Sequence, residues 1–441
     1  MFPKDAPPSN TYFIRTFGCQ MNAHDSEHIA GVLRSAGFEE SPTIDEAGVV
    51  VFNTCCVRQS AEDRVWGNVG AISTGGRASR VVAVCGCMAE KHGLDIMRRA
   101  RSVNLVFGME ALARLPGLVE AARLSPVCDL GEVGRASIDC LPSVRASTSQ
   151  AWVPVSHGCD NNCSYCVVPS VRGTERSRPL EDIIEEVERL ADEGTVEVVL
   201  LGQNVNSYGR DSRTGPFARL LEEVAGVDGI KRVKFETSHP RDLTPDVLEV
   251  IGSVPEVCEY LHLPVQSGSD SVLAAMNRGY SGDFYLELVR RARREVPGIT
   301  VTTDIIVGFP GETDDDFSAT LDLVKAAECD AAYLFLYSAR EGTPAATMSG
   351  EVPDMIKHQR FERLAATQDG FTARSLEKVV GSDVEVLIDG PARRGDMLSG
   401  RTRGHQVVLM QRTGVAGPIA SVHIDAAGKH SLRGSILNGE E

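Results

Sequence analysis

Between residues 151 and 375 the sequence alternates six times between a strand-like run and a helix-like run. Strands that alternate with helices form parallel sheets covered by helices, because each crossover returns the chain to the same end of the sheet. This pattern predicts an α/β domain, and six units are too few for a closed eight-unit barrel. The strand candidates are WVPVSH, VEVVLLG, VKFETS, YLHLPV, TVTTDIIVG and AAYLFLY.

Two further segments flank this region. Residues 11–125 also alternate, with the strands TYFIRTF, GVVVFN and RVVAVC, and they predict an N-terminal open parallel sheet. The run DSEHIAGVLRSAGF predicts a helix with Asp25 or Ser26 as N-cap. Residues 126–150 lose periodicity and are expected to form a linker. Residues 379–438 hold the short runs VEVLID, HQVVLM and SVHIDAA between glycine-rich turns, which predict a small antiparallel β-barrel.

The composition is that of an ordinary soluble protein, with 42% hydrophobic and 24% charged residues. No apolar run approaches the ~18 residues that a membrane span needs, and the first residues lack a signal-peptide pattern. We therefore expect a cytoplasmic protein with no membrane contact. In that compartment twelve cysteines point to metal ligands rather than to a disulfide scaffold.

The net charge of −16 argues against a protein coated in nucleic acid, but binding depends on local patches. From Pro391 to Asn438 there are seven basic residues and two acidic ones. Arg393, Arg394, Arg401 and Arg403 are candidates for RNA phosphate contacts, and a solvated charged surface is the alternative.

Three cysteines lie on one short polar run, HGCDNNCSYCVVPSVRG, with the spacing C-x3-C-x2-C. Three thiolates, from Cys159, Cys163 and Cys166, hold three irons of a 4Fe-4S cube and leave the fourth iron open to another ligand. A zinc knuckle would need a fourth ligand nearby and paired C-x2-C arms. Three buried thiols without a metal are the remaining alternative.

A second set follows the N-terminal strands: Cys19, Cys55 and Cys87. Parallel strands direct their carboxyl ends to one edge of the sheet, where ligands bind, so these thiols are expected to meet. Cys56 is a competitor for the role of Cys55, and Cys85 ends an apolar strand, where a thiol usually packs as a small hydrophobe. The alternative is that all of these thiols fill the core. Four isolated cysteines are interpreted as structural: Cys128, Cys140, Cys258 and Cys329.

The cysteine run resembles the signature of radical S-adenosylmethionine (SAM) enzymes, in which the open iron chelates SAM. Together with the N-terminal cysteine set and the C-terminal barrel, the chain resembles the radical SAM methylthiotransferase family. The resemblance implies a partial (β/α)6 radical SAM barrel and a C-terminal TRAM barrel, and it covers nearly the whole chain. The supporting stretches are GCQMNAHDSE, NTCCVR, CVVPSVRGTERSRP, LPVQSGSDSVL, TDIIVGFPGET and YSAREGTPAA. The family pattern favours Cys55 over Cys56 and Cys87 over Cys85.

The run GCQMN resembles the branch of this family that acts on N6-dimethylallyladenosine next to the anticodon of tRNA. Branches that act on threonylcarbamoyl-adenosine or on a ribosomal-protein aspartate have GCKVN-like and GCPKN-like runs, and they remain alternatives. From another class, a non-catalytic iron–sulfur electron carrier or RNA-binding protein is also considered.

The resemblance implies two 4Fe-4S clusters with different tasks. The cluster on Cys159, Cys163 and Cys166 cleaves SAM to a radical, and the second cluster holds the sulfur. SAM would serve as radical source and as methyl donor, the electrons would come from a flavodoxin or ferredoxin, and a monomer is expected. Polar residues at strand ends are candidates for SAM contacts, with helix caps or loop hydrogen bonds as the alternative: Gln203, Asn204, Ser238, Gln266 and Asp304. Three arginines that follow the cluster loop could pair with SAM or RNA phosphate, or could be solvated: Arg172, Arg176 and Arg178.

Overall fold

The computed structural model describes residues 10–56, 59–72, 80–131, 140–211, 214–392, 396–412 and 417–437. The chain divides into two compact units, each described here by itself. Unit 1 comprises residues 1–146, 157–161 and 166–175, and unit 2 comprises residues 147–156, 162–165 and 176–441. The part of the chain that the structure describes has no helix long and apolar enough to cross a membrane.

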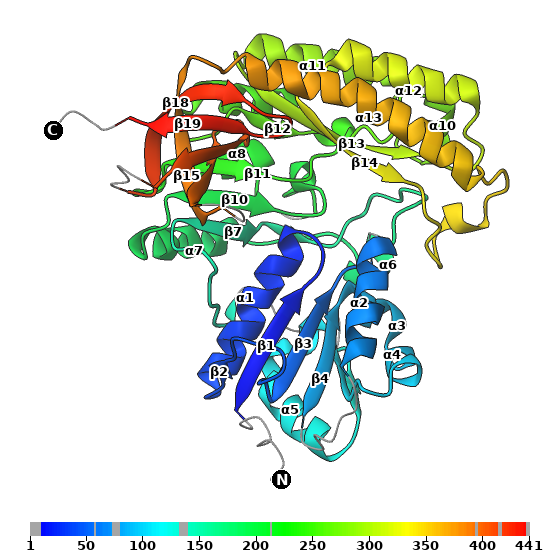
Figure 1. Cartoon of the computed structure of the whole chain (residues 1–441), viewed down its shortest axis with the longest axis vertical. Coiled ribbons are helices and arrows are strands. Elements are labelled where there is room, and N and C mark those ends of the chain that lie inside the picture. Colours follow the sequence, from blue (N-terminus) through cyan, green and yellow to red (C-terminus); the bar gives the residue numbers. More distant parts are fainter. Residues whose placement is uncertain are drawn as a thin grey trace. The chain divides into compact units, whose positions relative to one another are not determined.

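Unit 1 is built on a six-stranded parallel sheet in the order β2-β1-β3-β4-β5-β6 (Figure 1). Its strands are β1 (Thr11–Thr16), β2 (Glu39–Glu40), β3 (Val49–Thr54), β4 (Val81–Gly86), β5 (Leu105–Phe107) and β6 (Val127–Asp129). Its helices are α1 (Gln20–Ser35), α2 (Gln59–Ala71), α3 (Cys87–His92), α4 (Asp95–Arg99), η1 (Met109–Arg114), α5 (Leu115–Leu124) and α6 (Val168–Arg172).

Both faces of this sheet are buried, as its continuous apolar strands predict. Val49 and Val51 pack in one core with residues of α1 and α5, while Val50 and Phe52 pack in a second core with residues of α2, α3 and α4. Alternate residues of β3 thus face opposite layers, which is the period of two that a strand imposes. The predicted open parallel sheet is confirmed.

Two details of unit 1 differ from the prediction. Helix α1 begins at Gln20 with Cys19 as its N-cap, five residues before the expected cap at Asp25, and Asp25 is buried inside the helix. The first turn holds polar residues that the apolar periodicity could not reveal, and a capping box of Cys19 and Asn22 closes it. Strand β6 lies in the stretch that was assigned to the linker, and it pairs with β5.

Unit 2 contains the six parallel strands that the alternating pattern predicted. They form two three-stranded sheets, β11-β10-β7 and β12-β13-β14, and a parallel bridge between Val233 and Val257 lies between the two sheets. The strands are β7 (Gln150–Pro154), β10 (Glu197–Leu201), β11 (Arg232–Phe235), β12 (Tyr260–His262), β13 (Thr300–Val307) and β14 (Ala331–Leu336). A short pair, β8 (Ser156–His157) and β9 (Arg176–Ser177), lies beside the cysteine loop.

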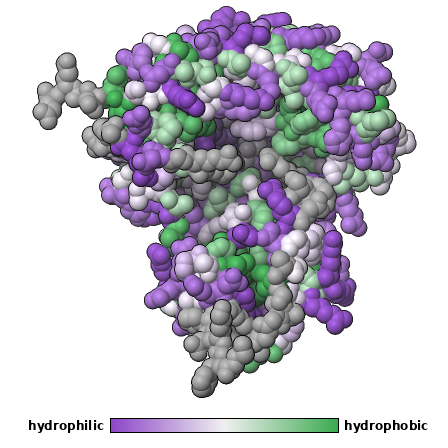
Figure 2. All heavy atoms as spheres, in the orientation of Figure 1, coloured by the Kyte–Doolittle hydropathy of each residue, from purple (hydrophilic) through white to green (hydrophobic). Residues whose placement is uncertain are grey.

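Helices cover the outer side of these strands. They are α7 (Leu180–Asp192), α8 (Phe217–Ala225), α9 (Pro245–Ser253), α10 (Asp270–Ala275), α11 (Gly282–Glu295), α12 (Asp314–Ala327) and α13 (Asp354–Glu377), with the short helices η3 (Val205–Ser207), η4 (Pro240–Asp242) and η5 (Pro344–Thr347). A single apolar core joins the strands to these helices. In Figure 2 the outward sides of α11, α12 and α13 are largely hydrophilic. The fold is the expected partial, open (β/α)6 arrangement.

The C-terminal region of unit 2 forms a closed five-stranded barrel in the order β15-β16-β17-β19-β18. Its strands are β15 (Asp383–Pro391), β16 (Met397–Thr402), β17 (Val407–Gln411), β18 (Ile419–Ala427) and β19 (Leu432–Ile436). The expectation of a purely antiparallel barrel needs correction, because β17 and β19 pair in parallel. Strands β16 and β19 are rich in Gly, Ser and Arg, so their composition concealed them from the sequence analysis.

The turn between β16 and β17 packs against the amino ends of the central strands. Arg232 and Lys234 donate hydrogen bonds to the carbonyl of Thr402, at 2.8 and 3.3 Å. Arg403 forms an ion pair with Glu259 at 2.8 Å and also donates to two backbone carbonyls. A Cβ on Gly404 would lie 2.3 Å from Oγ1 of Thr300, so only glycine allows this approach.

Replacement of Glu197 by Gln is expected to destabilise the protein by about 3–5 kcal/mol, because it removes the buried counter-charge that Arg232 and Lys234 share. The Glu197 carboxylate is fully buried and lies 2.7 Å from Arg232 and 3.1 Å from Lys234. Denaturant unfolding measures the effect. Glu193→Gln is the matched control: this carboxylate is exposed and pairs with Arg189 on the surface of α7, so its loss should cost under about 1 kcal/mol. Equal effects of both changes would contradict the prediction.

Candidate active site

The N-terminal cysteines lie at the carboxyl ends of three neighbouring strands, as predicted. Cys19 follows β1 as the N-cap of α1, Cys55 follows β3 directly, and Cys87 is the first residue of α3 after β4. Gly18, with φ of +128°, allows the first two loops to meet, since a Cβ there would lie 2.5 Å from the Cβ of Cys55. Cys85 lies within β4, fully buried, and burial raises its pKa, as the interpretation of a core thiol requires.

The thiol of Cys56 is hydrogen-bonded to Cys87, in an apolar cluster with Val167 and Val171. The hydrogen bond from Cys56 and the Arg172 guanidinium together lower the pKa of Cys87 to about 6, against the effect of burial. The same bond and burial raise the pKa of Cys56. Cys87 is therefore prepared to be a thiolate, the form that binds metal. The contact also keeps open which of Cys55 and Cys56 is the better ligand.

The cysteine loop that follows β7 is divided between the two units. Cys159 and Cys166 belong to unit 1, and Cys163 belongs to unit 2. In unit 1, the N–H of Cys159 donates to the Gly173 carbonyl at 3.2 Å, and the Cys166 sulfur accepts from the N–H of Val168 at 3.4 Å. In unit 2, Nη1 of Arg278 lies 3.5 Å from the Cys163 sulfur.

Arg278 is a site residue that the sequence analysis missed. It is 4% exposed, and it also donates to the carbonyl of Pro264 at 2.8 Å and to the Tyr280 hydroxyl at 2.9 Å. No recognised motif contains it, and it comes to Cys163 through the fold alone, from 115 residues further along the chain. This guanidinium places a fixed hydrogen-bond donor at the sulfur of a predicted cluster ligand.

The thiols of both sets fit iron–sulfur ligation on these grounds. Cys87 and Cys163 each face a guanidinium, and Cys166 accepts a backbone N–H; such donors tune the potential of a cluster. A 4Fe-4S cube binds each thiolate through a different iron, so its ligands are spaced more widely than those of a single ion. Among the residues described, no three His, Cys, Asp or Glu side chains converge on one ion.

Unpartnered polar atoms mark the expected SAM contacts of unit 2. Oε1 of Gln203, Oδ1 of Asn204 and Oγ of Ser238 are buried without a hydrogen-bond partner in the described structure. Such groups are costly unless a ligand or water satisfies them, so the site fits a polar ligand. Of the two alternatives, the Asn204 side chain makes no helix cap, but it does make a loop hydrogen bond by donating to Asp242 at 2.7 Å.

The two remaining SAM candidates lie on the neighbouring strands. Gln266 has a φ of +71°, and its backbone bridges to β13 through a hydrogen bond to the Asp304 carbonyl at 2.8 Å. The Asp304 carboxylate lies 3.6 Å from Nε2 of His262, and the pKa of His262 is raised because this carboxylate outweighs the effect of burial. All five candidates therefore lie at or beyond the carboxyl-terminal parts of β10, β11, β12 and β13.

Three further residues join this set, and none stood out in the sequence. Ser156, Asn206 and His239 also carry buried polar atoms without a partner among the described residues. Burial and the charge of Arg278 lower the pKa of His239 to about 3, so the ring is neutral. Its Nδ1 accepts from the N–H of Arg241, which leaves Nε2 as a donor.

Asp316 holds the loop that carries Gln266. It accepts hydrogen bonds from the hydroxyls of Ser269, Ser271 and Thr313 at 2.5, 2.5 and 2.7 Å. It also accepts from the backbone N–H of Thr313 at 2.9 Å, which closes a capping box at the start of α12. Burial acts to raise the pKa of Asp316, but these hydrogen bonds outweigh burial and hold the pKa below its usual range.

Asp316→Ala is expected to lower the free energy of unfolding by about 1–2 kcal/mol at pH 7. Because the folded pKa is depressed, this contribution is complete above the unfolded pKa of ~3.9 and is lost as the pH falls through the folded value. Urea unfolding at pH 7 and pH 3 tests this. The neighbouring exposed carboxylate gives the control, Asp315→Ala, and a difference between the two variants that grows on acidification would contradict the prediction.

The arginines near the loop have partners within the protein. Arg178 pairs with Glu186 at 2.8 Å and donates to the Pro154 carbonyl at 2.7 Å, and Arg172 pairs with buried Asp25 at 3.1 Å. Neither is the free or solvated side chain that the sequence suggested. In the C-terminal barrel, Arg403 is held by Glu259 and Arg401 by Asp389, which weakens both as phosphate ligands. Arg393 and Arg394 lie outside the described residues.

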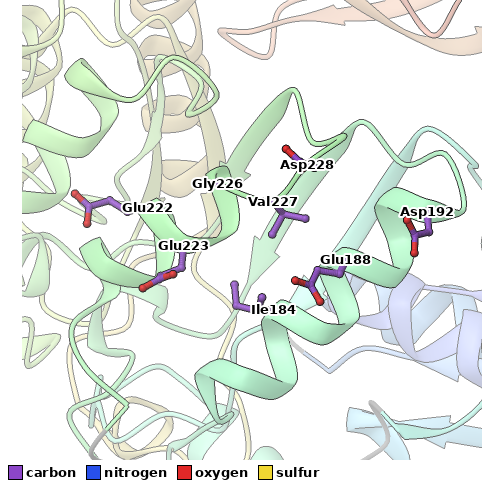
Figure 3. A pocket seen from close by; sticks show the side chains of 8 residues that line it. All are labelled: Ile184, Glu188, Asp192, Glu222, Glu223, Gly226, Val227 and Asp228. Atoms are coloured by element: carbon purple, nitrogen blue, oxygen red, sulfur yellow. The ribbon is translucent and has the colours of Figure 1, made fainter.

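An open groove of about 650 Å³ lies between α7 and α8 (Figure 3). Five carboxylates line it, Glu188 and Asp192 from α7 and three others from α8 and the turn after it, and they would repel RNA phosphates. None of the predicted site residues lies in this groove.

Comparisons with known proteins agree with this geometry. Residues 153–324 match the Radical SAM superfamily, and residues 11–108 match the Uncharacterized protein family UPF0004. A tRNA-2-methylthio-N(6)-dimethylallyladenosine synthase from Moorella thermoacetica is 46% identical over 97% of this chain and 99% of its own length. A protein of the same name from Frankia alni is 46% identical over 96% of this chain and 88% of its own.

Solved structures with low sequence identity share the fold. The radical SAM methyltransferase TsrM from Kitasatospora setae, with cobalamin and a [4Fe-4S] cluster bound, has a TM-score of 0.54 at 13% identity and covers 77% of this chain and 74% of its own. The cobalamin-dependent SAM radical enzyme OxsB has a TM-score of 0.53 at 11% identity and covers 83% of this chain and 56% of its own. These likenesses extend over 77% and 83% of this chain and concern the fold alone.

Proposed function

The chain belongs to the tRNA-2-methylthio-N(6)-dimethylallyladenosine synthase family, and we propose that it transfers a methylthio group to C2 of N6-dimethylallyladenosine beside the anticodon of tRNA. The observation that carries the proposal is the pair of cysteine sets, each beside a guanidinium, combined with 46% identity over nearly the full length of a relative of that name. The match extends over the C-terminal barrel, so it covers every segment that the reaction would need.

Each segment has a task in this proposal. Residues 11–125 would hold the sulfur-bearing cluster on Cys19, Cys55 and Cys87, residues 151–375 would bind SAM and the second cluster, residues 126–150 would link them, and residues 379–438 would hold RNA. When bound, the two 4Fe-4S clusters and SAM supply the electron, radical, sulfur and methyl group that protein side chains lack.

The protein's own side chains bind and orient. The six cysteines would hold the two clusters, and Arg278 donates a hydrogen bond to the sulfur of Cys163. Donors and acceptors left without partners at Asn204, Ser238 and His239 receive the polar groups of SAM. The substrate adenine must be unstacked to enter, which a single-stranded loop allows most cheaply. We further propose a monomer in the cytoplasm that accepts electrons from a flavodoxin or ferredoxin.

Mass spectrometry of tRNA nucleosides from a strain that lacks the gene tests the substrate. Loss of the methylthio group from dimethylallyladenosine, restored by the intact gene, is the expected result. Loss confined to threonylcarbamoyl-adenosine or to a ribosomal-protein aspartate would overturn the substrate and leave the chemistry standing. Failure of the reconstituted protein to form 5′-deoxyadenosine from SAM and a strong reductant would overturn the enzyme and favour an electron carrier.

A further inference from the structure

The part of the cysteine loop from Cys166 to Glu175 belongs to unit 1. Its helix α6 packs on α3, and Val167 and Val171 share an apolar cluster with Cys56 and Cys87. This segment is therefore part of the wall around the N-terminal cysteine set, although in sequence it continues the other cysteine motif.

Arg172 ends α6 and directs its guanidinium into this wall. Nη2 lies 3.1 Å from Oδ2 of Asp25, a carboxylate with no exposed surface, and the guanidinium also donates a hydrogen bond to the sulfur of Cys87. One cation thus contacts a buried carboxylate and a thiol of the N-terminal set.

The geometry of the Arg172–Asp25 pair differs from that of a purely structural ion pair. A guanidinium usually binds a carboxylate through two parallel hydrogen bonds. Here Asp25 uses one oxygen, while its Oδ1 has no hydrogen-bond partner among the described residues and lies 4.0 Å from Nδ1 of His24. The guanidinium also bonds the sulfur of Cys87. Asp25 therefore orients Arg172 for Cys87.

We propose that Arg172, oriented by Asp25, is a positioning residue that places the Cys87 sulfur and sets the reduction potential of the N-terminal cluster. The inference rests on the proposed function, since it assumes that this cluster is present. A fixed positive charge and an N–H donor at a ligand sulfur stabilise the more negative, reduced state of a cluster, so both raise its potential. The guanidinium is fixed to the same five-residue helix that follows Cys166.

The experiment uses the full chain with Cys159, Cys163 and Cys166 changed to Ala, so that only the N-terminal cluster forms. After anaerobic reconstitution, iron content is measured and the cluster is titrated electrochemically with detection by electron paramagnetic resonance. Arg172→Gln is expected to shift the midpoint potential to a more negative value while most of the iron is retained. Asp25→Asn and Arg172→Lys should shift it in the same direction by less.

Arg114→Gln is the matched control, because it removes an arginine from another Arg–Asp pair of unit 1, with Asp129 at 2.9 Å. An unchanged potential in Arg172→Gln, or the same shift in Arg114→Gln, would overturn the inference. If Arg172→Gln fails to fold, Arg172→Lys and Asp25→Asn decide: unchanged potentials in both overturn it. If the parent protein assembles no N-terminal cluster, it is the proposed function with two clusters that fails.

Discussion

Replacement of Cys163 by Ala is expected to reduce 5′-deoxyadenosine formation from SAM to less than about one thousandth of the parent rate, as when one member of a catalytic unit is removed. Three thiolates bind three irons of the cluster, and the loss of one thiolate prevents stable binding of the cube. Cys163 is also the thiol that Arg278 holds from unit 2. The product is measured by chromatography after anaerobic reconstitution with SAM and a strong reductant, without RNA.

Cys140→Ser provides the control for this result. Cys140 is exposed and isolated, so its loss should leave the rate within about twofold of the parent. Retention of more than one tenth of the rate in Cys163→Ala would show that the loop does not carry the SAM-cleaving cluster. Removal of the iron by a chelator should abolish the activity of the parent protein as well, with recovery after reconstitution.

Replacement of Cys55 by Ser should have a different signature. We expect the iron content to fall from about eight to about four per chain, because one of two four-iron cubes is lost. Formation of 5′-deoxyadenosine should persist while methylthio transfer to tRNA disappears, since the cluster that bears the sulfur is missing. Iron analysis and nucleoside mass spectrometry on one preparation measure both effects.

Cys56→Ser is the decisive partner of this experiment. Cys56 is fully buried and hydrogen-bonded to Cys87, whereas the Cβ of Cys55 lies against Gly18, beside Cys19. If Cys55 is the ligand, Cys56→Ser keeps about eight irons per chain. The reverse pattern, with four irons in Cys56→Ser and eight in Cys55→Ser, would reassign the ligand to Cys56.

The sequence predicted the sheets well because their signals are local. Continuous apolar runs such as Val49–Phe52 and helices with regular periodicity identify buried parallel strands and their crossovers. The start of α1 was missed because Cys19 is an unusual N-cap and the first helical turn is polar. The parallel pair β17–β19 was missed because strand order in a barrel depends on contacts between distant residues.

For the site, the sequence pointed to the cysteines that we propose as cluster ligands, but it did not show which arginines contact them. Cysteine spacing can be read directly from the sequence. By contrast, Arg278 contacts Cys163 from 115 residues away in the chain, and Arg172 contacts Asp25 from 147 residues away. Such pairs are created by the tertiary fold, so neither motif nor periodicity can signal them. The buried, unpartnered atoms of Ser156 and His239 became visible for the same reason only in the structure.

The attachment of the C-terminal barrel has a consequence for which nucleotide of a bound RNA is selected. A binding module on a flexible linker raises the local concentration of its ligand. Its distance from the active site then varies over a range that the linker length sets. Here contacts of Arg232, Lys234 and Arg403 hold the β16–β17 turn against the strands of unit 2. The barrel therefore lies at a fixed distance from the carboxyl ends of these strands. If the barrel binds RNA as proposed, the active site would accept only an adenine at a fixed distance from the bound stretch of RNA.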